Sequence, residues 1–152
     1  MKTKLIANII YPVYTKKGLK YEKKKRVIEQ LPPLNYEKPG KVLDGFILLY
    51  SCRVKFPVEA IRSKLSGQNF VEVIEEDLGY FQNLTYLDLS DNKIRIEQLA
   101  NLYNLVELNL QFNSMKSLLL TQDMFPVLEK LHLSYNNIPV SHLINLKHLK
   151  NL

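Results

Sequence analysis

The sequence predicts an α/β fold: a short solenoid with a parallel β-sheet on its concave face and short helices or turns on its convex face. One phrase occurs three times, starting at Leu84, Leu105 and Leu128. Each copy has the form L-x-x-L-x-L-x-x-N, with an apolar residue two positions after the asparagine. Equivalent leucines are 21 and 23 residues apart, and a fourth copy begins at Leu149. A period of this length predicts structural units that stack on one another.

The phrase is the leucine-rich repeat. Side chains alternate along a strand, so the two leucines of each L-x-L point to one face, which becomes the core. A buried amide can donate and accept hydrogen bonds, so the asparagines are expected to hold the turn that leaves each strand. These structural asparagines are Asn92, Asn113 and Asn136. Apolar residues at near-helical spacing then predict short helices or turns on the return side.

The predicted organisation has two parts, a basic N-terminal arm with a Pro-rich linker over residues 1–41 and a repeat domain over residues 42–152. Within the second part we expect an N-terminal cap and degenerate repeat (42–83), three repeats (84–104, 105–127 and 128–148) and the start of a truncated repeat (149–152). Terminal units of a stack are atypical because they must cover its open end. The uncapped edge at Leu149 and Leu152 therefore predicts self-association.

The cap is expected to be β-rich. Residues 42–56 contain many apolar and β-forming residues, with turn chemistry at Asp44-Gly45, so we expect them to pair with the first repeat strand. In the degenerate repeat, the leucine, asparagine and final apolar positions are taken by Ala60, Ser63, Leu65, Gln68 and Phe70. The acidic run Glu75–Asp77 is interpreted as a solvated helix start rather than a cation site, since it has no spaced ligand pattern.

Composition predicts a soluble, intracellular chain. The 152 residues suffice for one domain with a core, and the apolar runs are shorter than the ~18 residues of a membrane span. Cys52 is the single cysteine, so no intramolecular disulfide forms, and no secretory signal is recognised at the start. We expect the cytoplasm, including the cilium or cytoskeleton, or the nucleus. The glycosylation-like Asn83-Leu-Thr85 is interpreted as a chance match.

Basic charge is concentrated in the arm. Residues 1–41 hold eleven lysines and arginines against three acids, whereas the rest holds ten against twelve. The candidate contact residues are Lys16, Lys17, Lys20, Lys23, Lys24, Lys25 and Arg26. Such a run suits an acidic polymer, either tubulin tails or nucleic acid, and a solvated flexible arm is the alternative. The apolar stretch over residues 5–14 is a candidate strand or docking strip.

A family resemblance covers residues 42–152. It is carried by Leu43-Asp-Gly45 followed by Cys52, Phe70–Val73 with Asp77 and Phe81, Tyr86–Asn92, and Phe125–Asn136. These residues resemble the N-terminal repeat region of the X-ray radiation resistance-associated protein family. The resemblance implies a non-catalytic interaction scaffold of cytoplasm and nucleus, in proteins longer than this chain.

The sequence offers no pattern for catalysis, metal binding or a cofactor. Cys52 has no patterned histidine near it, because the histidines fall at His132, His142 and His148. A spacing of six does not place His142 and His148 on one helical face. The five glycines do not cluster into a phosphate loop. We therefore predict that the chain is not an enzyme and binds neither metal nor cofactor.

The residues between the repeat leucines are expected to form outward-facing columns on the concave side. The columns are Tyr86, Glu107 and Lys130; Asp88, Asn109 and His132; and Asp91, Phe112 and Tyr135. Exposed aromatic rings are common anchors of protein interfaces, although they can also shield neighbouring strands. We therefore predict a protein-binding scaffold in a cytoskeletal or ciliary assembly. The alternative is a nuclear adaptor whose arm contacts RNA or DNA phosphates.

Overall fold

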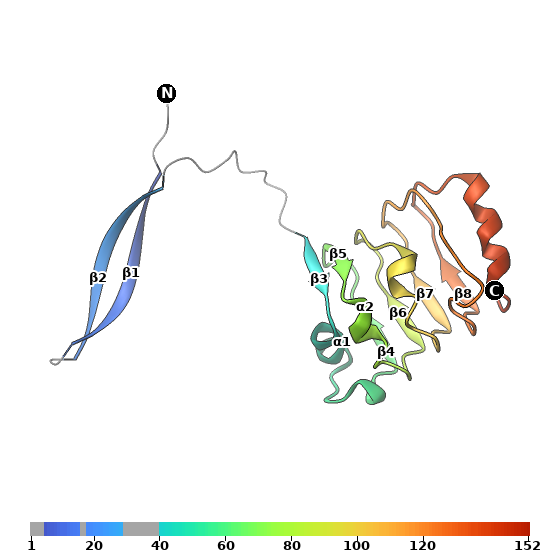
Figure 1. Cartoon of the computed structure of the whole chain (residues 1–152), viewed down its shortest axis with the longest axis horizontal. Helices are drawn as coiled ribbons and strands as arrows, with labels where there is room; N and C mark the ends of the chain where they lie inside the picture. Colours follow the sequence, from blue (N-terminus) through green and yellow to red (C-terminus); the bar gives the residue numbers. More distant parts are fainter. Residues whose placement is uncertain (1–4, 16–17, 29–39) are drawn as a thin grey trace, which may run out of the picture. The chain divides into compact units, whose positions relative to one another are not determined.

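The computed structural model describes residues 5–15, 18–28 and 40–152, and the chain divides into two compact units, Met1–Lys38 and Pro39–Leu152 (Figure 1). The predicted division fell after residue 41. Lys41 instead begins the first strand of the second unit, β3 (Lys41–Leu43).

The first unit contains a pair of long strands. β1 (Leu5–Thr15) pairs antiparallel with β2 (Gly18–Ile28), with Leu5 opposite Ile28 and Thr15 opposite Gly18. Five of the predicted contact residues, Lys20, Lys23, Lys24, Lys25 and Arg26, therefore lie on a strand and not in an unstructured arm. Lys16, Lys17 and the Pro-rich linker over residues 29–39 lie outside the described residues.

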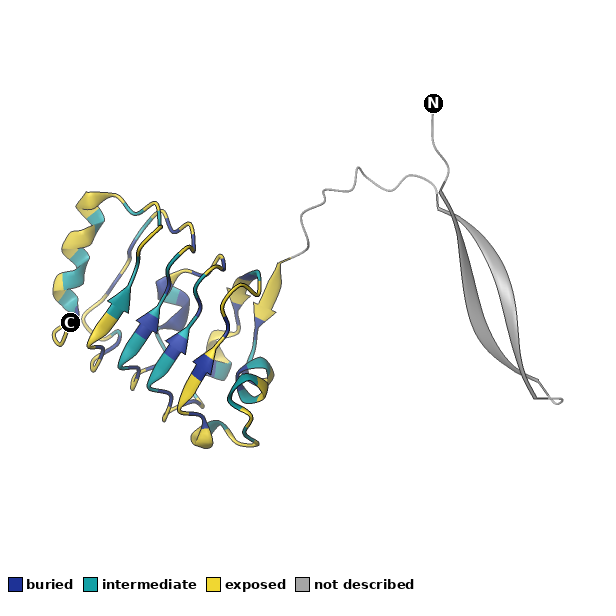
Figure 2. Ribbon diagram, turned by 180° about the vertical axis from the view of Figure 1, so that it is seen from behind, coloured by how far each residue is buried: buried dark blue, intermediate teal, exposed yellow. Residues whose placement is uncertain are grey.

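The second unit is built on a parallel sheet with one strand from each repeat. Its order is β4 (Arg62–Lys64), β6 (Tyr86–Asp88), β7 (Glu107–Asn109) and β8 (Lys130–His132). All three pairings are parallel, and Ser63, Leu87, Leu108 and Leu131 lie in one register. Figure 2 shows these strands side by side. The predicted α/β content and parallel sheet are thus present.

The repeat leucines form the core. Both leucines of each L-x-L are fully buried in the first two clean repeats, at Leu87, Leu89, Leu108 and Leu110. In the third repeat Leu131 and Leu133 are only half-buried, because among the described residues β8 pairs with β7 alone. The last repeat therefore presents an incompletely covered edge.

The degenerate repeat packs like the others at its apolar positions. Ala60, Ser63, Leu65 and Phe70 are buried, and Arg62 lies opposite Tyr86 in the sheet. Gln68 departs from the asparagine pattern, because its side chain is exposed and its side-chain amide donates, within the described residues, only to the Ser66 carbonyl of its own turn at 3.4 Å.

The return segments are short and unequal. The 3₁₀ helices are η1 (Pro57–Glu59), η2 (Ile96–Leu99) and η3 (Val140–His148), whereas residues 116–127 contain no helix. None of the helices in the described part of the chain has the length and apolar character needed to cross a membrane.

The cap differs from the β-rich prediction. Gly45–Cys52 is an α-helix, α1, and β3 pairs in parallel with β5 (Phe70–Val73) and not with the first repeat strand. Asp44 is the N-cap of this helix and accepts a hydrogen bond from the Ile47 amide at 2.9 Å. Asp44-Gly45 therefore starts a helix instead of making a hairpin turn.

A carboxylate from a later helix also fixes the start of α1. Asp77 lies on α2 (Glu75–Leu78), and its Oδ2 accepts a hydrogen bond from the Gly45 amide at 2.8 Å. Asp77 is half-buried, so the prediction of a wholly solvated acidic run is wrong at this residue. At the other end of α1, the hydroxyls of Ser51 and Ser63 are 2.5 Å apart, which ties the helix to β4. The cap thus covers the open end of the stack with a helix.

Candidate functional site

Three asparagines position the strand-end turns. Asn113 is buried, its Oδ1 accepts from the Ile94 amide at 2.8 Å, and its Nδ2 donates to the Leu89 carbonyl at 2.9 Å. Asn92 and Asn136 make equivalent bonds to the turns of their own and the preceding repeats. Each amide therefore links two neighbouring repeats, which sets the position of the exposed residues beside it.

The first column on the sheet begins one repeat earlier than predicted. Tyr86, Glu107 and Lys130 lie in register, and Arg62 precedes them on β4. The Arg62 guanidinium carbon lies 4.1 Å from the Tyr86 ring centroid, a cation–π contact. The column therefore starts with a cation held on a ring.

Glu107 is the acidic centre of this face. Its carboxylate oxygens lie 3.7 Å from Lys130 Nζ and 3.5 Å from His132 Nε2. Burial raises the pKa of the Tyr86 phenol, the charges of Asp88 and Glu107 raise it further, and Arg62 acts in the opposite direction. Tyr86 therefore stays protonated at neutral pH and keeps its hydroxyl as a hydrogen-bond donor.

Two residues of the second column form hydrogen bonds within the turns that follow their strands. Asp88 Oδ1 accepts from the amide and the hydroxyl of Ser90 at 3.0 and 2.7 Å. In the next repeat, Asn109 Oδ1 accepts from the Gln111 amide at 3.1 Å. These oxygens are already engaged in Asx-type turns, which leaves His132 as the member of the column that forms no such turn within the described residues.

The third column is not on the strands, which corrects the prediction. Asp91, Phe112 and Tyr135 lie in the turns beyond the strand ends, and each has a left-handed backbone, with φ of 54°, 55° and 59°. Gly67 takes the same position in the degenerate repeat, at φ 66°. This conformation suits glycine, and costs a residue with a side chain of ordinary size roughly 1–2 kcal/mol. Two aromatic residues nevertheless occupy it.

The two rings of this column are stacked and exposed. The centroids of Phe112 and Tyr135 are 4.2 Å apart with an interplanar angle of 6°. Phe112 is 49% exposed and Tyr135 is 73% exposed. The structure does not bring Tyr86 into this stack, because Tyr86 belongs to the first column and is half-buried beside Arg62. Of the three rings predicted for this face, two therefore form the exposed aromatic stack.

Sequence reasoning missed a second set of structural asparagines, on the return side. Their side-chain nitrogens donate to carbonyls of the preceding repeat at 2.6–2.8 Å, and the residues are Asn83, Asn101, Asn104, Asn145 and Asn151. Asn83, for example, donates to the Val58 carbonyl at 2.7 Å, so the amide of the glycosylation-like motif is engaged within the fold. The signal available in the sequence was the recurrence of asparagine in the return segments before Leu84, Leu105 and Leu152, although residues 114–127 contain none.

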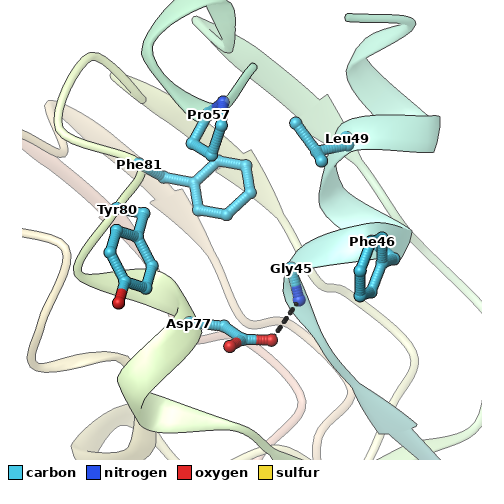
Figure 3. Close-up of a pocket in the computed structure, with 7 residues that line it drawn as sticks. All are labelled: Gly45, Phe46, Leu49, Pro57, Asp77, Tyr80 and Phe81. Atoms are coloured by element: carbon cyan, nitrogen blue, oxygen red, sulfur yellow. Dashed lines mark hydrogen bonds between the residues drawn. The ribbon is translucent and has the colours of Figure 1, made fainter. Parts of the chain in front are cut away.

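A separate small pocket lies in the cap (Figure 3). It has a volume of about 130 Å³ and is walled mainly by apolar side chains of α1 and of the segments around η1 and α2, namely Phe46, Leu49, Pro57, Tyr80 and Phe81. Drug-sized ligands occupy pockets of about 300–1,000 Å³. The polar group at its edge, Asp77, is bonded to the Gly45 amide. The pocket is therefore a feature of the cap packing and not a site of chemistry.

The single cysteine, Cys52, is not activated as a nucleophile. The Cys52 thiol donates to the Arg62 carbonyl at 3.2 Å. Burial raises the pKa of this thiol, while hydrogen bonds with Ser63 and Ser51 act in the opposite direction. The protonated thiol is a poor nucleophile. Within residues 40–152, no three histidine, cysteine or acidic side chains converge in a metal-binding group.

The parallel sheet, the buried leucines and the asparagine turns are features expected of leucine-rich repeats. Residues 83–103 match the Leucine Rich Repeat family model. Such repeats expose extended surfaces that bind protein partners. The matched repeat therefore suggests a role in protein–protein interaction.

A particular relative supports the resemblance seen in the sequence. The chain is 29% identical over 99 residues to X-ray radiation resistance-associated protein 1 of Mus musculus. The match covers 65% of this chain and 13% of that protein. The predicted resemblance to this family is thereby confirmed, over a small part of the relative's length.

Proposed function

We propose that the chain is a non-catalytic scaffold whose sheet face, on the concave side of the repeat stack, binds a protein partner within a larger cytoskeletal or ciliary assembly. The observation that carries this proposal is the exposed stack of Phe112 and Tyr135. Both rings are held at backbone positions that favour glycine or asparagine. Strained residues persist where function requires them, and clustered aromatic rings are typical interface anchors.

The surroundings of the rings support the same surface. Glu107 is paired with Lys130 and lies beside His132 on the strands, and Arg62 lies on the Tyr86 ring in the same column as Glu107. An interface with apolar anchors beside fixed charges combines affinity with orientation. This combination lies on the strand side and its adjoining turns, so that side is the proposed contact face.

The test uses variants that separate binding from folding. In Phe112→Asn and Tyr135→Asn each ring is replaced by a residue that tolerates the left-handed conformation, so the fold is expected to keep its stability. The full chain and the double variant are compared by affinity capture from cell extract with quantitative mass spectrometry. We expect partners captured by the unchanged chain to be reduced about tenfold or more with the double variant, as for loss of a ring anchor.

The matched control is Tyr103→Asn. Tyr103 is an exposed ring on a return segment, so its loss should leave capture unchanged. Circular dichroism checks that all variants fold. If the double variant captures the same proteins in the same amounts as the unchanged chain, the sheet face is not the binding surface.

A second candidate function rests on the charge of the N-terminal unit. Eleven basic residues against three acids in residues 1–41 suit an acidic polymer. In this alternative the chain is a nuclear adaptor whose basic strand contacts RNA or DNA phosphates while the repeats hold a protein. In the cytoskeletal scaffold proposed above, the same basic strand instead contacts acidic tubulin tails, and the protein acts in the cytoplasm.

The cytoskeletal scaffold and the nuclear adaptor are distinguished with a variant in which Lys23, Lys24, Lys25 and Arg26 are neutralised together. Co-sedimentation with microtubules and retention on single-stranded RNA are measured for the full chain over a salt series. Phosphate contact predicts that the logarithm of the RNA affinity falls linearly with the logarithm of the salt concentration, and that the slope decreases in the neutralised variant. Retention on microtubules without retention on RNA favours the cytoskeletal scaffold, and the reverse favours the adaptor.

A further inference from the structure

An open pocket lies beside the two stacked rings. It has a volume of about 450 Å³ and is lined by Ser66, Ser90, Asp91, Gln111 and Phe112. These residues come from the turns that follow β4, β6 and β7. The pocket therefore crosses three successive repeats at the ends of their strands.

The Phe112 ring forms one wall of this pocket. Tyr135 covers one face of the ring at 4.2 Å, so the opposite face is turned toward the preceding repeat, where Asp91 takes the equivalent position. One repeat earlier that position is Gly67, which has no side chain. The Asp91 carboxylate extends over Gly67, with Oδ2 3.4 Å from the position that a Cβ would take there, so it lines the pocket on the side away from the Phe112 ring.

The remaining walls are polar. The hydroxyls of Ser66 and Ser90 are 2.9 Å apart and keep lone pairs for a further donor. The Asp91 carboxylate is exposed and has no hydrogen bond or ion pair within the described part of the chain. An apolar occupant would strip water from these groups without replacing their hydrogen bonds, which is unfavourable. The pocket therefore suits a cation with several donors.

We propose that this pocket binds an arginine side chain of the protein partner, an inference that rests on the proposed scaffold function. The guanidinium stacks on the open face of Phe112 and donates to the Asp91 carboxylate. Its planar fork of donors meets both walls at once, because arginine stacks on rings and pairs with carboxylates in two-point geometry. Lysine carries a compact ammonium and meets only the charge requirement.

The chain itself places an arginine on an aromatic ring near carboxylates in the first column. There Arg62 lies 4.1 Å from the Tyr86 ring centroid, and the charges of Asp88 and Glu107 act on that ring's hydroxyl. In the first column the arginine is supplied by the preceding repeat. In the third column the preceding repeat supplies Asp91 and the arginine position is open, which leaves it to a partner.

The test uses three short probe peptides of identical sequence except for a central arginine, citrulline or lysine. Each is titrated into the ¹⁵N-labelled full chain and followed by amide chemical shifts. We expect the arginine peptide to shift the resonances of Ser90, Asp91 and Phe112, and to bind at least about threefold more tightly than the lysine peptide, as for one exposed pair with added stacking. Citrulline keeps the shape and loses the charge, so its shifts should be weak.

Two variants complete the experiment. Asp91→Asn removes the charge and keeps a side chain suited to the left-handed backbone, so arginine affinity should fall about threefold to fivefold while the fold is unchanged. Asp123→Asn, which neutralises an exposed acid on a return segment, should have no effect. Equal binding of the arginine and citrulline peptides, or shifts confined to other residues, overturns the proposal.

Failure of the arginine proposal can be told apart from failure of the scaffold proposal. If the arginine peptide leaves the pocket resonances unchanged while the ring variants still lose their captured proteins, the arginine inference fails and the scaffold stands. If the peptide binds as expected while capture is unaffected by the ring variants, the pocket stands and the scaffold function fails.

Discussion

Replacing Asn113 by alanine tests the physical basis of the repeat stack. Asn113 is 3% exposed, and its amide accepts from the Ile94 amide at 2.8 Å and donates to the carbonyls of Leu89 and Gln111 at 2.9 and 3.1 Å. The two carbonyls keep other partners, since Leu89 O also accepts from Asn92 and Gln111 O from the Asp91 amide. The Ile94 amide, in contrast, donates only to Asn113 within the described residues, so the substitution leaves it buried without an acceptor.

The expected loss follows from these contacts. One orphaned buried donor costs about 1–3 kcal/mol, and each of the two other hydrogen bonds contributes about 0.5–1.5 kcal/mol. Asn113→Ala should therefore lower the free energy of unfolding by about 2–6 kcal/mol. Because small domains are stable by only about 5–15 kcal/mol, this change should be large in any equilibrium measurement.

Urea unfolding followed by far-UV circular dichroism measures the effect, since the chain has no tryptophan for fluorescence. Asn137→Ala is the matched control, because Asn137 is exposed and contributes its backbone amide, not its side chain, to the bonds of the described fold. The control should stay within about 0.5 kcal/mol of the unchanged chain. If Asn113→Ala and Asn137→Ala have the same midpoint, the asparagines do not hold the stack together and the argument fails.

Three further outcomes follow from the structure. Asp77→Ala removes the acceptor of the Gly45 amide at 2.8 Å and should lower the free energy of unfolding in urea by about 1 kcal/mol. Asp77→Asn keeps an oxygen acceptor, so its loss should be smaller. Equal losses in the two variants would contradict the capping role of Asp77. The pKa of the Cys52 thiol is raised in the folded chain, so the fold binds this proton more tightly than the unfolded chain does. The contribution of Cys52 to the free energy of unfolding is therefore complete below the ordinary thiol pKa of about 8.5 and is lost as the pH rises through the raised pKa. Cys52→Ser should remove this alkaline loss, as measured by urea unfolding at two pH values. Ile144 is 65% exposed near the uncovered edge of the last repeat. Association of the chain with itself, measured by sedimentation velocity over a concentration series, should therefore be weaker in Ile144→Glu than in the unchanged chain. An unchanged chain that stays monomeric at all concentrations would exclude association through this edge.

The repeat phrase accounts for much of the fold because its information is local and periodic. Alternation along a strand decides which leucines are buried, and a constant spacing places equivalent residues such as Leu87 and Leu108 side by side in the sheet. The first two predicted columns follow from the same register. The position of the third column could not be predicted from this alternation, because its residues lie beyond the ends of the strands. The left-handed turn that orients Phe112 does not follow from a period of two residues.

The cap was mispredicted for a related reason. Residues 42–56 carry apolar and β-forming side chains that suit a strand, yet Gly45–Cys52 is helical. The helix is fixed by Asp44 at its start and by Asp77, 32 residues later in the chain. A carboxylate brought close only by folding outweighs weak local preference, as β-propensity commonly yields to tertiary context.

By itself the sequence determined the repeat, its register, its buried leucines and the asparagines at the turns, since all of these depend on residue type at a fixed short spacing. The tertiary structure alone decided that Phe112 stacks on Tyr135, that Arg62 lies on Tyr86, and that a pocket opens beside Asp91. These contacts join side chains 21 or more residues apart, and their geometry depends on how closely successive turns are stacked, which no single repeat specifies.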